Sequence, residues 1–205
     1  MSTNQEKLNR DLIDNARKGN LENVKSLIEN GANVDAKSNY GDTALTCSSS
    51  NGRFEIVKHL IENGANVNPK GIYRNETALI NAVKCEDFNI VKYLVDNGAD
   101  VNAKEYEGQT ALMFASFNGD LEITKYLLDN GADVNVESDV HEYTALDWAK
   151  ENRKLKIVKC LREFINKENV EENTEDSLFV ILNKCNDLGI SYKVNSDKTV
   201  TLKFW

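Results

Sequence analysis

Apolar residues recur at helical spacing in three similar stretches of the chain, and polar turns separate these stretches. Within each stretch the apolar positions fall on one face of a short helix. The three sets are Ile56, Val57, Leu60 and Ile61; Ile90, Val91, Leu94 and Val95; and Ile123, Leu127 and Leu128. Gly64, Gly98 and Gly131 follow these sets, where the C-terminus of a helix favours a residue that tolerates positive φ. The pattern predicts equivalent amphipathic helices that each end at a glycine.

Two short motifs recur along the chain with one shared period. The dipeptide Gly-Ala and the tripeptide Thr-Ala-Leu each return after 33 or 34 residues. They begin at Gly31, Gly64, Gly98 and Gly131, and at Thr43, Thr77, Thr110 and Thr144. A period of this length indicates stacked helix pairs, because one pair cannot bury its apolar face alone. We predict a short helix after each Thr-Ala-Leu and a second, amphipathic helix before each Gly-Ala.

These motifs resemble the repeats of the ankyrin family, whose units contain G-x-T-P-L-H near the start and G-A-D-V-N at the end. Residues 108–112 read Gly-Gln-Thr-Ala-Leu and residues 98–102 read Gly-Ala-Asp-Val-Asn. The resemblance covers about residues 8–166 and implies an all-α repeat solenoid of five helix-turn-helix units with projecting hairpins. The expected repeats are about 8–37, 38–70, 71–104, 105–137 and 138–166.

The chain departs from the family pattern in two ways. Alanine replaces the family's proline, and Thr46, Ile80, Met113 and Asp147 occupy the position of its histidine. We therefore expect the family's imidazole hydrogen bonds between repeats to be missing and the solenoid to be somewhat less stable.

The two ends of the solenoid carry polar residues on ridges that are apolar elsewhere. Asn23 stands where later repeats have isoleucine, and Arg162 stands where earlier repeats have isoleucine, valine or leucine. Terminal repeats need a solvent-exposed outer face, so these substitutions predict caps at the first and fifth repeats.

The segment after the solenoid has a different pattern. Residues 167–174 are polar and acidic and indicate a linker, whereas residues 175–188 have a single apolar helical face. Two alternating stretches around a turn at residues 195–198 predict a β-hairpin, so residues 175–205 form a helix plus β-hairpin appendage. Such a unit is marginal alone. It docks on the fifth repeat, forms a homodimer through the hairpin edge, or receives a missing layer from a partner.

Composition limits which classes of partner and which cellular compartment we expect for this chain. The formal net charge is −8, which disfavours nucleic acid as a partner, and no run of apolar residues is long enough for a membrane span. The N-terminal residues lack the basic-then-apolar pattern of a secretory leader. The four cysteines show no metal-ligand spacing, which fits reduced thiols. We expect a cytoplasmic protein that binds neither nucleic acid nor membrane.

Candidate chemistry is sparse. His59 aligns with tyrosines of later repeats, and His141 has only Asp139 and Glu142 as loose carboxylate neighbours for a metal. Cys85 lies between Lys84 and Glu86 on the groove side, where an exposed thiol is either reactive or incidental. No glycine-rich phosphate loop occurs. We predict no enzyme activity, no cofactor and no metal site.

A binding surface remains as the main functional feature. In this architecture the hairpin tips and the ends of the first helices line a concave groove. The predicted contact residues are Tyr40, Asp42, Tyr73, Arg74, Lys84, Tyr106, Gln109, Phe117, Asn118, His141 and Tyr143. Tyr40, Tyr73 and Tyr106 recur with steps of 33 residues, so we expect a row of rings that Tyr143 nearly extends. Tyrosines are enriched in binding hot spots, which favours a contact role for these rings. The alternative is that the rings stack on adjacent hairpins and only stiffen the solenoid.

We therefore interpret the chain as an adaptor or scaffold that binds a partner protein through the concave groove without turnover. The alternative is a bacterial or parasite effector, in which the solenoid targets a host protein and the C-terminal segment dimerises or binds a second partner. We expect a monomer, with a homodimer through the C-terminal hairpin as the other arrangement.

Overall fold

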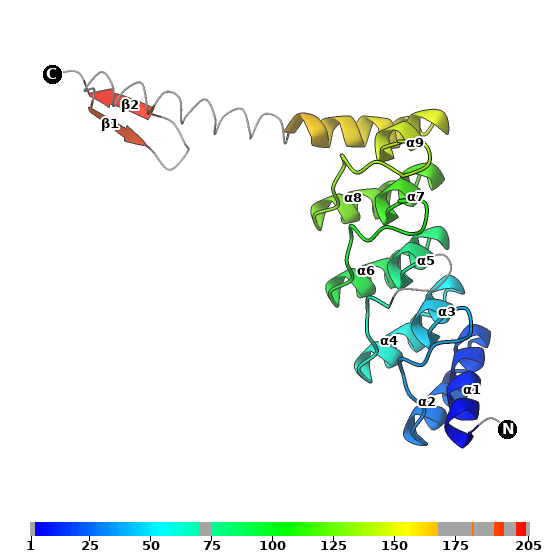
Figure 1. Cartoon of the computed structure of the whole chain (residues 1–205). Helices are drawn as coiled ribbons and strands as arrows, with labels where there is room; N and C mark the ends of the chain where they lie inside the picture. Colours follow the sequence, from blue (N-terminus) through cyan, green and yellow to red (C-terminus); the bar gives the residue numbers. More distant parts are fainter. Residues whose placement is uncertain (1–2, 70–74, 168–181, 183–190, 195–199, 204–205) are drawn as a thin grey trace. The chain divides into compact units, whose positions relative to one another are not determined.

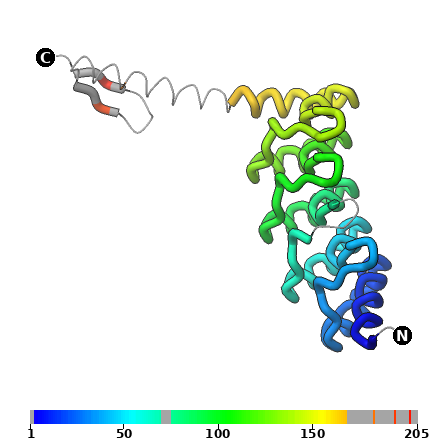
Figure 2. The backbone as a smooth tube through the Cα atoms, in the orientation of Figure 1, coloured from blue at the N-terminus to red at the C-terminus, as the bar shows by residue number. Residues whose placement is uncertain are grey.

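The structure, a computed structural model, describes residues 3–69, 75–167, 182, 191–194 and 200–203 (Figures 1 and 2). The chain divides into two compact units, Met1–Leu161 and Arg162–Trp205.

The first unit is a stack of helix pairs, which confirms the predicted α-helical repeat solenoid. The helices are α1 (Asn4–Lys18), α2 (Leu21–Glu29), α3 (Ala44–Ser50), α4 (Phe54–Glu62), α5 (Ala78–Lys84), α6 (Phe88–Asp96), α7 (Ala111–Asn118), α8 (Leu121–Asp129) and α9 (Ala145–Glu151). Odd-numbered helices pack on one another in one row and even-numbered helices α2 to α8 in a second row (Figure 1). A further helix covers residues 155–167, from the end of the first unit into the second, and reaches the residue at which the predicted linker starts.

The threonine of Thr-Ala-Leu begins the first helix of a repeat. At α3 and α9 it forms a reciprocal capping box, in which the Thr43 hydroxyl accepts from the backbone N–H of Thr46 and the Thr144 hydroxyl from that of Asp147. Thr46 and Asp147 occupy the family's histidine position. Their side chains accept hydrogen bonds from the backbone of their own capping threonine, at 2.9 Å for Thr46. Two repeats therefore use this position to cap a helix.

The helix ends confirm the role of the repeating glycines. Gly64, Gly98 and Gly131 have φ values of 82°, 86° and 85° after the even-numbered helices. The first helix of the third repeat ends differently, since Glu86 adopts a φ of 56° where Gly119 of the fourth repeat has 87°. A side chain in this left-handed region strains the backbone, so α5 ends less favourably than α7.

The burial pattern confirms both caps. Ile56, Ile90, Ile123 and Ile157 are buried, whereas Asn23 is exposed at the equivalent position of the first repeat. Arg162 is likewise exposed on the last helix. The first helix begins at Asn4, earlier than the predicted start near residue 8, because Thr3 and Glu6 form a capping box.

Asparagines that follow the Gly-Ala motif join successive repeats. Asn68 donates from Nδ2 to the carbonyl of Gly98 at 2.9 Å and accepts at Oδ1 from the N–H of Asp100 at 2.8 Å. Asn102 makes the same pair of bonds to Gly131 and Asp133, at 2.9 and 2.8 Å. These bonds set the spacing of adjacent repeats and so the relative positions of the surfaces that the repeats carry.

Aromatic edges support the row of even-numbered helices. Phe54 on α4 meets Tyr93 on α6 at 5.7 Å between ring centroids, and Phe88 on α6 meets Tyr126 on α8 at 5.5 Å. Both pairs are T-shaped, with interplanar angles of 80° and 84°. His59, which aligns with Tyr93 and Tyr126, is half-buried on α4 beside Asn63, in agreement with a packing or surface role.

The second unit contains two short strands, β1 (Ser191–Val194) and β2 (Val200–Lys203), paired antiparallel with Ser191 opposite Lys203. Of the predicted helix at residues 175–188, only residue 182 is described, and it is helical. Residues 168–174 of the predicted linker and the predicted turn at residues 195–198 lie outside the described residues. None of the described helices has the length and apolar character needed to cross a membrane.

Candidate functional site

A recess of about 340 Å³ opens on the row of odd-numbered helices toward the C-terminal end of the first unit. We call it the aromatic recess. Its lining residues are Lys84 from α5, Gln109 from the hairpin before α7, Met113, Phe114, Phe117 and Asn118 from α7, and Trp148 from α9. The recess brings together four of the predicted contact residues, namely Lys84, Gln109, Phe117 and Asn118.

Aromatic rings form much of this lining. Phe117 is 46% exposed, and its ring meets Trp148 edge to face at 5.8 Å between centroids. The ammonium of Lys84 lies 4.2 Å from the centre of the Phe114 ring and 2.7 Å from a carboxylate oxygen of Glu76. The charge of Lys84 is therefore paired, and the recess offers mainly apolar and aromatic surface.

Trp148 links the recess to the hairpin of the fifth repeat. Its ring lies 5.8 Å from that of His141 and 5.4 Å from that of Tyr143, and these last two lie 5.7 Å apart. The indole N–H of Trp148 is buried and has no acceptor among the described residues, so ring packing holds this side chain in place. His141 and Tyr143, both predicted contact residues, therefore adjoin the recess through Trp148.

Sequence reasoning did not identify Trp148 or Phe114. Both stand four residues after the threonine of Thr-Ala-Leu, so they occupy equivalent positions of neighbouring repeats. The first helices of neighbouring repeats pack on one another, so aromatic residues at the same position of two neighbouring repeats would have indicated that their rings lie close together.

Three of the four tyrosines considered for the predicted row lie in the described part of the chain. Tyr40 and Tyr106 are 70% and 76% exposed on their hairpins. Tyr143 does not extend this exposed row, because its ring is half-buried against Trp148 and His141. Tyr73 and Arg74 lie outside the described residues. Tyr106 is thus an exposed ring at a hairpin tip. Its hairpin is linked to that of the fifth repeat by a hydrogen bond of 2.8 Å, which the Asp139 N–H donates to the Glu107 carbonyl.

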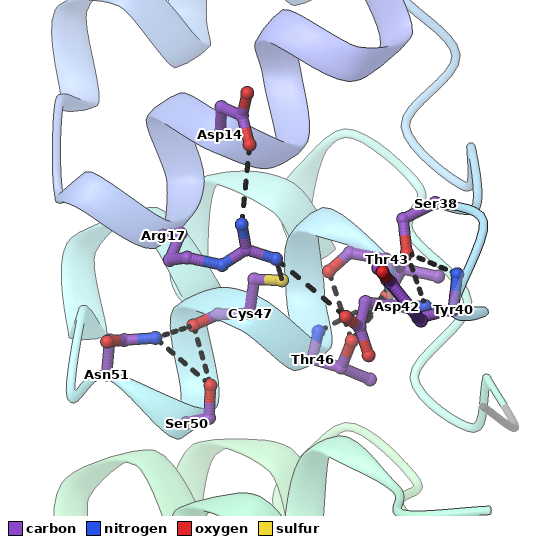
Figure 3. A network of polar contacts seen from close by, with 10 residues as sticks. All are labelled: Asp14, Arg17, Ser38, Tyr40, Asp42, Thr43, Thr46, Cys47, Ser50 and Asn51. Carbon is purple, nitrogen blue, oxygen red and sulfur yellow. Dashed lines mark hydrogen bonds and ion pairs between the residues drawn. The ribbon is translucent and has the colours of Figure 1, made fainter. Parts of the chain in front are cut away.

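A second recess, of about 510 Å³, lies at the N-terminal end of the same row, lined by α1 residues and by residues 37–40. Arg17 on its wall lies at the centre of a polar network (Figure 3). The guanidinium donates to Asp14 at 3.4 Å and to the Cys47 sulfur at 3.3 Å, and it lies 3.8 Å from Asp42. Of the predicted contact residues, Tyr40 lines this recess and Asp42 pairs with its arginine.

Comparison with known families agrees with the geometry of the repeats. A model of ankyrin repeats in three copies matches residues 12–105, and a second model of ankyrin repeats in many copies matches residues 86–128. The chain belongs to the ankyrin-repeat family. Ankyrin repeats generally mediate protein–protein interaction, and proteins built from them are typically non-enzymatic. No curated protein matches the chain.

The thiols of this ankyrin solenoid do not favour nucleophilic chemistry. Cys85 is exposed, but its thiol donates to the Ser50 carbonyl at 2.9 Å, and partial burial together with Asp87 raises its pKa. The hypothesis of a reactive Cys85 is therefore disfavoured, because its thiolate is scarcer at neutral pH than that of an ordinary cysteine. Burial likewise raises the pKa of Cys47, although Arg17 opposes the shift.

His141 packs against Tyr143 and Trp148 in the ankyrin solenoid. Within the described part of the chain, no three histidine, cysteine, aspartate or glutamate side chains are grouped so that they could hold a metal ion. The geometry therefore assigns His141 to an aromatic cluster.

Proposed function

We propose that this ankyrin-repeat protein is an adaptor that binds a partner protein along its row of odd-numbered helices, with the aromatic recess as the main contact. The observation that carries the proposal is the pairing of Phe117, 46% exposed, with Trp148 at the mouth of one recess. Large aromatic side chains that are held in place contribute strongly to binding at low entropic cost.

The chemistry of the recess supports binding without turnover. Its lining contains no histidine, cysteine or carboxylate, and Lys84 is already paired with Glu76 at 2.7 Å. Apolar rings with a few polar neighbours, such as Gln109 and Asn118, match the composition of a contact that buries an apolar side chain. The side chain of Asn118 also donates to the Val83 carbonyl at 3.3 Å, which connects α7 to α5 beneath the recess.

Site-specific photo-crosslinking tests this proposal. A benzophenone amino acid replaces Phe117 in the full chain, and a matched variant carries it at Lys125, an exposed residue of α8. After irradiation in extract of the source cells, we expect a discrete protein adduct from position 117 and none of that mass from position 125. Equal adducts from both positions, or no adduct from position 117, would contradict the proposal.

The strands of the second unit favour a second candidate, a scaffold made bivalent by self-association. In the described residues β1 and β2 form a two-stranded sheet, and a sheet of this size is marginal without a further layer. A second copy that pairs with the sheet edge would supply this layer and join two solenoids. The same arrangement would serve an effector that targets a host protein.

Light scattering coupled to size exclusion tests this second candidate. The full chain is compared with a chain that ends at Asn166. A dimeric full chain and a monomeric shortened chain would support self-association through the C-terminal segment, whereas a monomeric full chain would refute it.

A further inference from the structure

The hairpins of the fourth and fifth repeats carry an excess of negative charge beside the aromatic recess. We call residues 104–107 and 137–142 the acidic tips. Their charged residues are Lys104, Glu105, Glu107, Glu137, Asp139 and Glu142. Five carboxylates and one ammonium leave four negative charges without a compensating charge on the same hairpins.

Most of these carboxylates project into solvent. Glu107, Glu137, Asp139 and Glu142 are exposed, and Glu105 is half-buried. Lys104 lies 3.6 Å from Asp139 and is the one cation of the tips. The side chains of Glu137 and Glu142 form no hydrogen bond or ion pair with any described residue. The tips therefore present carboxylates that are available to a cation from outside the chain.

Hydrogen bonds at the fourth-repeat tip orient the carboxylates of Glu105 and Glu107. Glu105 accepts from the N–H groups of Glu107 and Gln109 at 2.8 and 3.1 Å. Glu107 accepts from the side-chain amide of Gln109 at 3.2 Å. These donors are neutral, so they orient the carboxylates without removing their negative charge.

The aromatic recess and the acidic tips are continuous. Gln109 lines the recess and binds Glu107, and Trp148 of the recess contacts His141 of the fifth-repeat tip. Lys84 is the one charged residue of the recess lining, and it is paired with Glu76 at 2.7 Å. An apolar, locally neutral recess thus adjoins a negatively charged rim.

We infer that the partner segment is basic, with an apolar side chain in the aromatic recess and lysine or arginine side chains against the acidic tips; this inference rests on the proposed function. Tyr106, 76% exposed, stands between Glu105 and Glu107. A guanidinium stacked on its ring can pair with either neighbouring carboxylate, because arginine combines stacking with bidentate hydrogen bonding. Charge complementarity of this kind accelerates association and excludes acidic segments.

Selection from a displayed library of random 16-residue peptides against the immobilised full chain tests the inference. We expect enriched peptides to combine one large apolar residue with two or more lysines or arginines. A synthetic peptide of the enriched sequence is then titrated against four proteins: the unchanged chain, the tip variant Glu107→Gln/Glu142→Gln, the recess variant Phe117→Ala, and the control Glu55→Gln/Glu122→Gln. The control removes two exposed glutamates from α4 and α8. Thermal unfolding checks that all four remain folded.

The tip variant is expected to weaken binding about threefold to thirtyfold, since each exposed charge pair contributes modestly, and the control is expected to bind as the unchanged chain does. Higher salt should weaken binding to the unchanged chain and have less effect on the tip variant. Enriched peptides without basic residues would overturn the inference, and so would equal affinities of the peptide for the tip variant and the control. In either case, weaker binding of the peptide to Phe117→Ala would still support the proposed function. If no peptide is enriched, or Phe117→Ala binds as well as the unchanged chain, the proposed function itself is refuted.

Discussion

Asn102 offers the clearest test of how successive repeats are held together. Its side chain belongs to the third repeat and binds two backbone groups of the fourth, the Gly131 carbonyl at 2.9 Å and the Asp133 N–H at 2.8 Å. Substitution by alanine removes both bonds and leaves the helices of each repeat untouched. Asn135 provides a matched control, because it is the equivalent residue of the fourth repeat and its side chain makes no such bond to a described residue.

The expected magnitude follows from the exposure of these groups. A neutral hydrogen bond contributes about 0.5–1.5 kcal/mol net, so two bonds contribute about 1–3 kcal/mol. Asn102 is exposed, and water can bind the two backbone groups once its side chain is gone. We therefore expect Asn102→Ala to lower the free energy of unfolding by about 1–2 kcal/mol, in the lower part of that range. The control Asn135→Ala should change it by less than about 0.5 kcal/mol.

Two measurements check this prediction. Urea unfolding followed by circular dichroism gives the change in the free energy of unfolding for each variant. Hydrogen exchange gives the local effect, because the Asp133 amide loses its acceptor in Asn102→Ala and should exchange faster. Equal destabilisation by the two substitutions, or unchanged protection of the Asp133 amide, would refute the idea that the Asn102 side chain joins these repeats.

Three further predictions concern individual side chains. Glu86→Gly should stabilise the fold by about 0.5–1 kcal/mol, because glycine adopts the φ of 56° at the end of α5 without the steric strain of a side chain. Urea unfolding measures this change, and a lower unfolding midpoint for the variant would contradict the prediction. A hydrogen bond from the hydroxyl of Thr144 lowers the pKa of Asp147 in the folded protein. The ionised carboxylate therefore stabilises the folded state at pH values above the pKa that Asp147 has in the unfolded chain. This stabilisation is lost as the pH falls through the lower pKa of the folded state. Between pH 5 and about pH 2.5 the melting temperature of the unchanged chain should therefore fall further than that of Asp147→Asn, and equal falls would exclude the effect. Because partial burial and Asp87 raise the pKa of Cys85, iodoacetamide should alkylate it several-fold more slowly than N-acetylcysteine at pH 7.5, and equal rates would argue against the raised pKa.

Parts of the candidate surface were predictable because the repeat fixes the backbone. Once the positions of Thr110 and Gly131 define a repeat, the residues at the end of α7 must face the groove, and Phe117 and Asn118 do line the aromatic recess. Residues of the hairpin tips were less predictable. Tyr106 is exposed as expected, whereas Tyr143 turns toward Trp148 and is half-buried.

The amino-acid sequence by itself determined the period, the helix pairs, the glycine helix ends and the two polar caps. These features depend on local requirements, namely which residues begin a helix, which tolerate positive φ and which ridge faces a neighbour, and a one-dimensional stack repeats them unchanged. Only the tertiary structure decided which side chains meet across repeats. Trp148 joins Phe117, and Arg17 reaches Cys47 and Asp42, because residues about one repeat apart in the sequence become neighbours when the helix pairs stack. The ring packing and charge pairing in these contacts between repeats depend on the direction in which each side chain points, which the repeat pattern does not specify.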